Sequence, residues 1–314
     1  MKLYFAPMEG ITTYTYRNAH NQMFGMCDKY YAPFIVPSAD ERITLKTLRD
    51  ILPDRNQAEI VPQVLCNCPE AFQNFAEKVF YLGYEELNLN LGCPATTVVK
   101  KKRGAGALLN TESLDQFMEQ IFSRTRISVS VKTRVGFYHH EEFEQLLAVY
   151  QKHPISLLIV HPRVREEFYR GIANRETFEN AYLRSKETLC YNGDITTVLD
   201  YQAITARYNE LHHVMIGRGA VTNPAIFREI KGGEPLRTEE LIAFSDLLEE
   251  RYMALLQSDA FTLHKLKEVW QYALLNFPEE KKIAKAVKKA NRLLDLNSAI
   301  RQLPEIENQK EKKR

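Results

Sequence analysis

Cys93 lies in the part of the sequence whose residue types are best suited to chemistry. It belongs to the stretch Asn88-Leu89-Asn90-Leu91-Gly92-Cys93-Pro94, where a strand-like segment ends in a turn made by glycine and proline. A thiol can act as a nucleophile, a metal ligand or a proton donor, depending on its pKa. No histidine lies near Cys93 in the sequence to activate a nucleophile, so we favour a proton donor that works beside a hydride source.

A cationic loop follows this cysteine. It carries four consecutive bases, Lys100, Lys101, Lys102 and Arg103, and leads into the glycine-rich segment Gly104-Ala105-Gly106-Ala107. Bases of one sign raise the local concentration of an anionic partner. A thiol followed by such a loop therefore suits a reaction on an anionic substrate.

Length and composition indicate a large folded protein. The chain has 314 residues, 45% of them hydrophobic, and a net charge of +2, which is consistent with one large domain and a smaller one. The five cysteines form no even disulfide framework, and Cys66 and Cys68 lack a second ligand pair, so we expect no metal site. The N-terminal apolar run is too short for a signal peptide, and no segment reaches the roughly 20 apolar residues of a membrane span. We therefore expect a cytoplasmic protein without membrane contact, and the sequence indicates no obligate protein partner.

Short apolar strands alternate with amphipathic helices over the first three quarters of the chain. We predict strands at residues 3–6, 30–34, 60–65, 86–90, 128–132, 157–160, 189–191 and 214–216. Helical spacing of apolar residues predicts helices between them, among them residues 71–82, 114–122 and 143–150. This alternation predicts an α/β fold, a (β/α)8 TIM barrel over residues 1–232. We favour it over a doubly wound open sheet because polar residues or glycines follow several strands.

The residues after the strands of such a barrel meet at one end and form its active site. Lys132 can stabilise an anion, and the amides of Gln63 and Asn90 can pair with an imide edge. The loops after the last two strands contain glycine, and their backbone N–H groups can hold a phosphate beside Arg218. FMN needs this set of groups, so we predict an FMN site. The polar, glycine and turn residues at the strand ends are Pro7, Met8, Glu9, Gln63, Asn90, Cys93, Lys132, Arg134, His161, Arg163, Asn192, Gly193, Asp194, Gly217 and Arg218.

The alternation stops near Gly232-Gly233-Glu234-Pro235, where we place a domain boundary. Helices predicted at residues 239–257, 262–276 and 279–294 would form a small all-helical bundle over residues 233–305. The last of these helices would carry a basic stripe on one side, made of Lys281, Lys285, Lys288 and Arg292. Such a stripe is either a solvated face or a surface for a phosphate backbone, and its unbalanced charge favours the second. We expect the basic segment 306–314 to be disordered.

The motifs together resemble the tRNA-dihydrouridine synthases, a family of flavin enzymes. The resemblance covers nearly the whole chain, and each motif is weak alone, but all of them in this order at strand ends are highly specific. It implies that FMN, reduced by NADPH, delivers a hydride to C6 of a uridine in tRNA while Cys93 protonates C5. The motifs that carry it are Ala6-Pro7-Met8-Glu9-Gly10, Asn90-Leu91-Gly92-Cys93-Pro94, Gly104-Ala105-Gly106-Ala107-Leu108-Leu109, Val131-Lys132-Thr133-Arg134, Asn192-Gly193-Asp194 and Gly217-Arg218-Gly219-Ala220.

The resemblance also implies roles for single residues. The flavin would lie on Pro7, Met8 and Glu9, its ring beside Gln63, Lys132 and His161, and its phosphate on Asn192, Gly193, Asp194, Gly217 and Arg218. Asn90 and Arg134 fall where the family handles the uracil base. We expect tRNA to be held by Arg163, the bases 100–103 and the basic stripe. One departure is Pro162, which follows His161 where the family usually has a small residue and which removes a backbone donor.

Two other functions fit parts of the sequence. An FMN-dependent barrel oxidoreductase that acts on a free pyrimidine, of the dihydroorotate dehydrogenase kind, would share the barrel and the flavin but does not need a basic helical domain. A flavin-free RNA-binding module on a barrel would share the clustered bases. Neither accounts for both the strand-end residues and the basic helical region.

Overall fold

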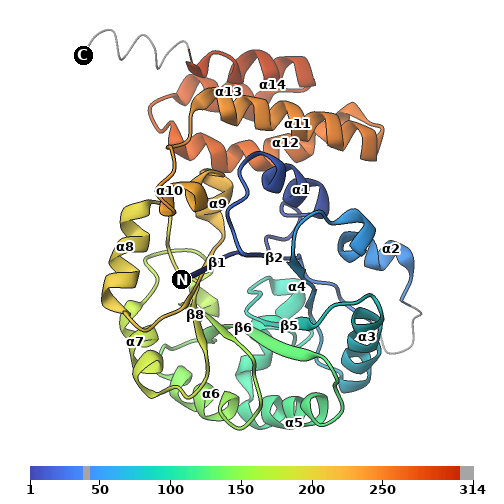
Figure 1. Cartoon of the computed structure of the whole chain (residues 1–314), viewed down its shortest axis with the longest axis vertical. Helices are drawn as coiled ribbons and strands as arrows, with labels where there is room; N and C mark the ends of the chain where they lie inside the picture. The colour runs from blue at the N-terminus through green and yellow to red at the C-terminus, as the bar shows by residue number, and fades with distance from the viewer. Residues whose placement is uncertain (38–42, 305–314) are drawn as a thin grey trace.

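Nine short parallel strands form the centre of the protein in the computed structural model, which describes residues 1–37 and 43–304 (Figure 1). They lie in the order β3-β2-β1-β9-β8-β7-β6-β5-β4. Their bounds are β1 (Lys2–Phe5), β2 (Lys29–Tyr31), β3 (Ile60–Val61), β4 (Gln63–Val64), β5 (Glu86–Leu91), β6 (Ser128–Gly136), β7 (Leu158–Val164), β8 (Leu189–Tyr191) and β9 (His213–Ile216).

The two end strands of this order, β3 and β4, are two halves of one predicted strand. Pro62 separates them, and because proline has no backbone N–H it interrupts the ladder of hydrogen bonds. β3 pairs with β2 and β4 pairs with β5, so the segment 60–64 closes the sheet into a barrel. The eight predicted strands and the TIM-barrel fold are therefore confirmed.

Helices surround the barrel, as Figure 1 shows. The predicted helices 71–82, 114–122 and 143–150 correspond to α3 (Pro69–Tyr81), α5 (Thr111–Phe122) and α6 (Glu142–Tyr150). Each begins before its apolar pattern does, because the first turn of a helix is set by polar or proline residues; Asn110, for example, accepts a hydrogen bond from the Ser113 N–H at 2.8 Å. The other helices of the barrel are α1 (Tyr14–Met23), α2 (Leu45–Leu48), α4 (Thr96–Val99), α7 (Arg175–Arg184), α8 (Val198–Arg207), α9 (Arg218–Thr222) and α10 (Ile226–Ile230).

Strand β5 illustrates how the barrel separates its two sides. Side chains of a strand alternate between its faces. Leu87, Leu89 and Leu91 are fully buried in the main core with residues of the surrounding helices, whereas Asn88 and Asn90 belong to the other face of the strand. That face lines the barrel interior, where apolar residues such as Tyr4, Tyr31, Ile159 and Met215 form a second, smaller core.

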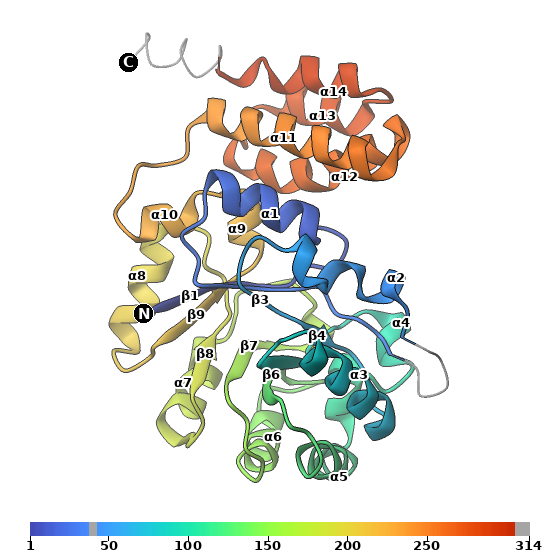
Figure 2. The same ribbon diagram turned by 45° about the vertical axis from the view of Figure 1, so that its right-hand side comes forward.

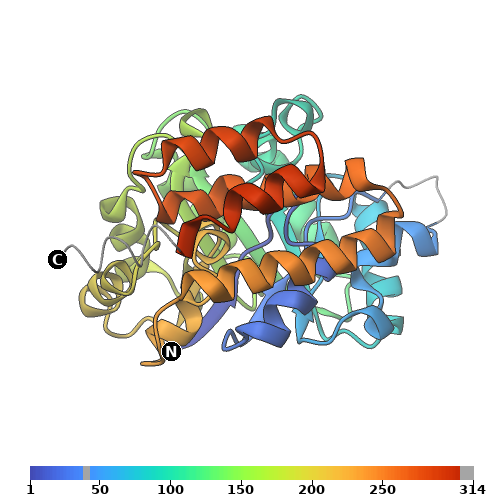
Figure 3. The same cartoon turned by 90° about the horizontal axis from the view of Figure 1, so that it is seen from above.

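Four helices within residues 238–300 form a layer on one side of the barrel (Figures 2 and 3). They are α11 (Thr238–Leu256), α12 (Asp259–Ala273), α13 (Lys281–Lys289) and α14 (Leu293–Ile300), and α11 and α12 pack on α1 and α9 of the barrel. Lys265 of α12 donates a hydrogen bond to the Gly10 carbonyl at 2.9 Å, so this layer touches the loop after β1. None of the helices within residues 1–37 and 43–304 is long and apolar enough to cross a membrane.

The single helix predicted over residues 279–294 is wrong in its second half. Helix α13 ends at Lys289, Ala290 adopts an extended conformation, and α14 starts at Leu293 in another direction. The break lets Leu296 and Ile300 reach the core, where both are fully buried. The Ala290 carbonyl, freed from the helix, accepts a hydrogen bond from Lys267 at 3.0 Å. The predicted tail 306–314 lies outside the described residues.

Candidate active site

One pocket of about 260 Å³ lies where the strand ends meet. Polar groups from β4, β5, β6 and β7 converge there with the loops after β1, β8 and β9. The predicted residues that line it are Pro7, Met8, Glu9, Gln63, Asn90, Cys93, Lys132, Arg134, His161, Asn192, Gly193, Gly217 and Arg218. A concave site with a few convergent polar groups is the usual form of a small-molecule site.

The Cys93 turn (residues 92–95) is held by hydrogen bonds to its backbone. Asn90 Oδ1 accepts from the N–H groups of Gly92 at 3.1 Å and Cys93 at 2.9 Å, and the Cys93 carbonyl accepts from the Ala105 N–H at 3.0 Å. Gly104 permits the latter contact, because a Cβ there would lie 2.9 Å from the Cys93 carbonyl oxygen. The glycine-rich segment thus supports the cysteine turn from behind.

Two arginines brace the same turn, Arg134 from β6 and Arg165 from the loop after β7. Arg134 donates to the Gly92 carbonyl at 3.0 Å, and Arg165 donates to the Pro94 carbonyl at 3.2 Å. Arg134 also donates to the carbonyls of Val164 at 2.8 Å and Phe168 at 2.6 Å. These bonds to charged donors are among the stronger hydrogen bonds in proteins. They fix Cys93 relative to the loop after β7.

The electrostatic environment keeps Cys93 protonated. Burial raises the pKa of the Cys93 thiol, and the nearby Glu9 carboxylate raises it further. The charges of Arg134 and Lys132 act in the opposite direction, so they stabilise the thiolate that forms once the proton has left. A thiol that holds its proton at neutral pH and has cations near it is suited to proton donation more than to nucleophilic attack.

Lys132 and His161 are tuned by burial as well. Burial and the neighbouring Arg134 charge lower the pKa of Lys132 to about 8, so this group titrates within reach of neutral pH. Burial and the surrounding cations lower the pKa of His161 well below its usual range, so the imidazole is neutral. Arg163 donates to its Nε2 at 3.2 Å, which leaves the proton of the neutral ring on Nδ1.

Asp194 lies between two arginines at the end of β8. Arg163 donates to both carboxylate oxygens at 2.9 and 2.6 Å, Arg218 donates at 2.8 Å, and the Ala173 N–H donates at 2.9 Å. Burial by itself would raise the pKa of Asp194, but these bonds and charges lower it below its usual range. Its carboxylate is thus engaged with the arginines, and it orients Arg218 toward the pocket.

Arg163 is fully buried, with 1% of its surface exposed. Its donors are bound by Asp194, by His161 and by the carbonyls of Arg170 at 3.1 Å and Gly171 at 2.7 Å. The expected contact of Arg163 with RNA is therefore wrong, because its guanidinium has no route to a phosphate. It instead supports the His161 ring and the loop after β7.

That loop carries an aromatic residue that was not predicted as part of the site. Tyr169 lines the pocket with 54% of its surface exposed, and the guanidinium groups of Arg134 and Arg218 lie 5.3 and 4.9 Å from its ring centre. Phe168 before it has a φ of 52°, a strained value for a non-glycine residue. Backbone strain of this kind is common where a structure must aim a side chain at a site.

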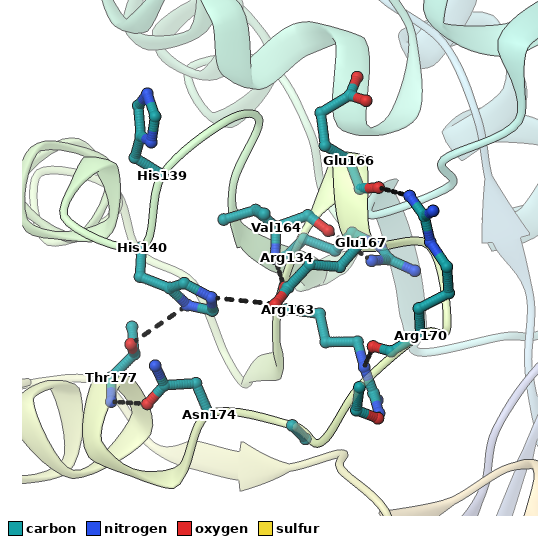
Figure 4. Close-up of polar contacts among 12 residues, drawn as sticks. Arg134, His139, His140, Arg163, Val164, Glu166, Glu167, Arg170, Asn174 and Thr177 are labelled. Carbon is teal, nitrogen blue, oxygen red and sulfur yellow. Dashed lines mark hydrogen bonds and ion pairs between the residues drawn. The ribbon is translucent and has the colours of Figure 1, made fainter.

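Figure 4 shows how the base of this loop is held. Glu167 accepts the Val164 N–H at 2.7 Å, and His140 lies 3.3 Å from the other oxygen of the same carboxylate. Asn174 caps the following helix, accepting the Thr177 N–H at 3.0 Å. The loop that presents Tyr169 is therefore anchored at both ends.

The helical layer contributes a further aromatic side chain to the pocket. Tyr272 of α12 lines it, although α12 is far from the barrel strands in the sequence. No strand-end argument could have found it. The pocket is thus completed by the C-terminal helices.

The predicted RNA-contacting bases lie outside the pocket. Lys100, Lys101 and Lys102 are exposed, whereas Arg103 is half-buried and donates to Asn67 at 3.1 Å. Lys281, Lys285 and Lys288 are exposed on α13. Arg292 is not part of this stripe, because it precedes α14 and forms an ion pair with Asp295 at 2.7 Å.

Fold and site together define a (β/α)8 barrel whose polar strand ends converge on one pocket. The chain belongs to the dihydrouridine synthase (Dus) family, since the sequence profile of that family matches residues 4–309. It is 27% identical over 266 residues to tRNA-dihydrouridine synthase B of Shewanella oneidensis, covering 81% of this chain and 78% of that protein. It is also 27% identical over 238 residues to the probable tRNA-dihydrouridine synthase of Staphylococcus epidermidis, covering 71% and 70%.

Solved structures share the barrel at low sequence identity. Histamine dehydrogenase from Rhizobium sp. 4-9 matches with a TM-score of 0.55 and 10% identity, covering 74% of this chain and 45% of that one. The old yellow enzyme from Trypanosoma cruzi matches with a TM-score of 0.52 and 10% identity, covering 75% and 89%. At these identities the likeness concerns the fold alone.

Proposed function

We propose that this protein is a tRNA-dihydrouridine synthase that acts in the cytoplasm. It would reduce the C5–C6 double bond of uridines in tRNA, with NADPH as the source of electrons and FMN as the bound cofactor. The observation that carries the proposal is the position of the Cys93 thiol, on a turn fixed by backbone hydrogen bonds, in a pocket that also contains Lys132 and Gln63. Its membership in the Dus family and the names of its relatives agree with this function.

The residues of the pocket fit FMN. Lys132 offers a cation to an anionic flavin ring, and Gln63 offers an amide edge to its pyrimidine portion. A Cβ on Gly219 would lie 2.1 Å from the Ile195 carbonyl oxygen, so this glycine lets the loops after β8 and β9 approach each other. Gly193, Gly217 and Arg218 line that junction and are suited to a phosphate.

Cys93 would act as the general acid. Bound FMN, once reduced, supplies a hydride equivalent for C6 of the uracil ring. The Cys93 Sγ–H bond breaks as a C5–H bond forms, and the thiolate that remains takes a proton from solvent. Arg134 and Lys132 stabilise this thiolate through their charges, while burial keeps the proton on sulfur until it is needed.

Asn90 and Tyr169 would hold the base. Asn90 donates one of its two amide hydrogens to Gln63 Oε1 at 2.8 Å, and the other remains for a uracil oxygen. Tyr169 is an exposed ring at the mouth of the pocket, and aromatic faces stack on unstacked bases. The target uridine must leave its stack to reach this site.

Exposed lysines would bind the RNA backbone. Lys100, Lys101 and Lys102 follow the Cys93 turn, and Lys281, Lys285 and Lys288 form a stripe on α13. Contacts of lysine with phosphates supply affinity without reading the base sequence. A free pyrimidine would need neither surface.

One assay separates this function from its rivals. The purified protein is tested for flavin absorbance and then given NADPH with unmodified tRNA transcript or with free uracil. The products, dihydrouridine in tRNA or free dihydrouracil, are measured by mass spectrometry. We expect a yellow protein that adds two hydrogens to tRNA and leaves uracil unchanged. Turnover of uracil would instead indicate a free-pyrimidine oxidoreductase, and a colourless protein that cannot be reconstituted with FMN would indicate an RNA-binding module.

A further inference from the structure

A chain of polar side chains runs through the barrel interior from the Cys93 turn to the opposite end of the barrel. Asn90 donates to Gln63 at 2.8 Å, Gln63 donates to Asn88 at 2.7 Å, and Asn88 donates to Ser130 at 2.8 Å. Ser130 in turn donates to the Glu86 carboxylate at 2.6 Å. We call these five residues, Asn90, Gln63, Asn88, Ser130 and Glu86, the amide relay.

Both ends of the relay fix its direction. At the upper end, the N–H groups of Gly92 and Cys93 can only donate, so Asn90 must present its oxygen to them. At the lower end, a carboxylate can only accept, so the Ser130 hydroxyl must donate to Glu86. The side-chain amides of Asn90, Gln63 and Asn88 then have one consistent orientation, in which every donor faces an acceptor.

The lower end holds the Glu86 carboxylate in place. Glu86 is the first residue of β5, whereas Cys93 follows the last residue of that strand, so the two lie at opposite ends of the barrel. Lys29 donates to Glu86 at 3.2 Å and Tyr31 donates at 3.2 Å. Lys29 also pairs with Glu59 at 3.3 Å. The side chain of Glu86 is 18% exposed, so substitutions there disturb the core less than they would at the fully buried Asn88.

We propose that Glu86 and Ser130 are positioning residues that orient the Gln63 and Asn90 amides and hold the Cys93 turn. Neither residue lines the pocket, and both act through the relay. A side-chain amide whose acceptor is lost is stabilised by a 180° rotation that exchanges its nitrogen and oxygen, because a buried donor without a partner is costly. If the Asn88 amide rotated in this way, its nitrogen would face the Gln63 nitrogen. The amides of Gln63 and then Asn90 would have to rotate as well, and the Cys93 N–H would lose its hydrogen bond to Asn90 Oδ1.

The test uses substitutions at the lower end and reads the state of the upper end. Ser130→Ala removes the hydroxyl, and Ser128→Ala is the matched control, because Ser128 is exposed on the same strand. Glu86→Leu removes the acceptor, and Glu86→Gln retains one. The first readout is the rate at which iodoacetamide alkylates Cys93 in the protein as purified, across pH 6–9. It is followed by mass spectrometry of the Cys93 peptide, with Cys27 as the internal reference.

The second readout is turnover of tRNA, which rests on the proposed function, whereas the alkylation does not. In Ser130→Ala and Glu86→Leu we expect iodoacetamide to alkylate Cys93 about fivefold faster than in the wild type, the size expected for one buried hydrogen bond. In the same variants kcat should fall by a similar factor, with KM for tRNA unchanged. Ser128→Ala and Glu86→Gln should behave like the wild type. Equal Cys93 alkylation in the wild type, Ser130→Ala and Glu86→Leu overturns the proposal.

Two complications remain distinguishable. If Ser130→Ala does not fold, the contrast between Glu86→Leu and Glu86→Gln decides the question by the same readouts. If the wild type does not act on tRNA, the proposed function fails, while the alkylation of Cys93 still tests the relay.

Discussion

The substitution Asp194→Asn removes the negative charge that holds two arginines at the end of β8. Arg163, 1% exposed, and Arg218 both donate to the Asp194 carboxylate. Asparagine has nearly the same shape but no charge, so the Arg163 guanidinium would stay buried without its counter-ion. We expect a loss of stability and, because Arg218 is released, weaker binding of FMN.

The size of the stability loss follows from the burial of the ion pair. Removing one partner of a buried pair costs about 3–5 kcal/mol. The Asp194 side chain is 30% exposed and asparagine can still accept one hydrogen bond, so we expect the lower end, about 3 kcal/mol. At about 2 °C per kcal/mol for a protein of this size, the melting temperature should fall by roughly 6 °C.

The pH dependence of this difference has a definite sign. The pKa of Asp194 is lower in the folded protein than in the unfolded chain. A carboxylate of this kind stabilises the fold at pH values above its unfolded pKa of about 3.9, and the contribution is lost as the pH falls toward its folded pKa. The difference between wild type and Asp194→Asn should therefore be constant above about pH 5 and shrink below about pH 4.

The assay is thermal unfolding followed by circular dichroism, with FMN affinity measured by fluorescence titration. Arg218→Met is the matched control, because Arg218 is 38% exposed and an exposed ion pair contributes about 0–1 kcal/mol. This control should weaken FMN binding with little change in melting temperature. A melting temperature of Asp194→Asn equal to that of the wild type would refute the structural role assigned to this carboxylate.

Two further predictions concern charge. Because burial lowers the pKa of Lys132 to about 8, Lys132 loses its proton as the pH rises through 8, and FMN affinity should fall about tenfold from pH 7 to pH 9. Fluorescence titration measures this affinity, and Lys132→Arg should abolish its pH dependence. An FMN affinity of the wild type that does not change with pH would contradict the prediction. Lys285→Glu combined with Lys288→Glu should weaken tRNA binding and reduce the slope of log K against log salt by about 1.5, measured by filter binding. Arg292→Ala is the control and should leave the slope unchanged, because Arg292 is paired with Asp295. An unchanged slope in the double variant would mean that the stripe is only a solvated face.

The barrel was predictable because its signals are local. Each strand is a short apolar run, and the strand ends bring residues such as Gln63 and Lys132 into one pocket whatever the helices do. The split at Pro62 was not predicted, because a single strand was expected over residues 60–65, although proline lacks the donor that a continuous strand needs. The pocket-lining residues at the strand ends could therefore be named without a structure.

Other features depend on contacts between distant segments. The break in the helix at Ala290 could not be predicted, because no glycine or proline lies near it in the sequence. It is set by the packing of α14. Arg163 and Asp194 stand at strand ends like the other candidates, but they face each other, which spacing alone does not reveal. Tyr169 and Tyr272 reach the pocket from a loop and from another layer.

The central claim is that Cys93 protonates the uridine in tRNA. Stopped-flow absorbance of the flavin tests it most directly, because reduction by NADPH and reoxidation by tRNA are then measured as separate steps. For Cys93→Ala, with Cys27→Ala as the control, we predict normal FMN content and normal reduction by NADPH. Reoxidation by tRNA should be slower by about 10²–10⁴-fold, the usual contribution of a general acid. Reoxidation of Cys93→Ala by tRNA at the wild-type rate would contradict the account.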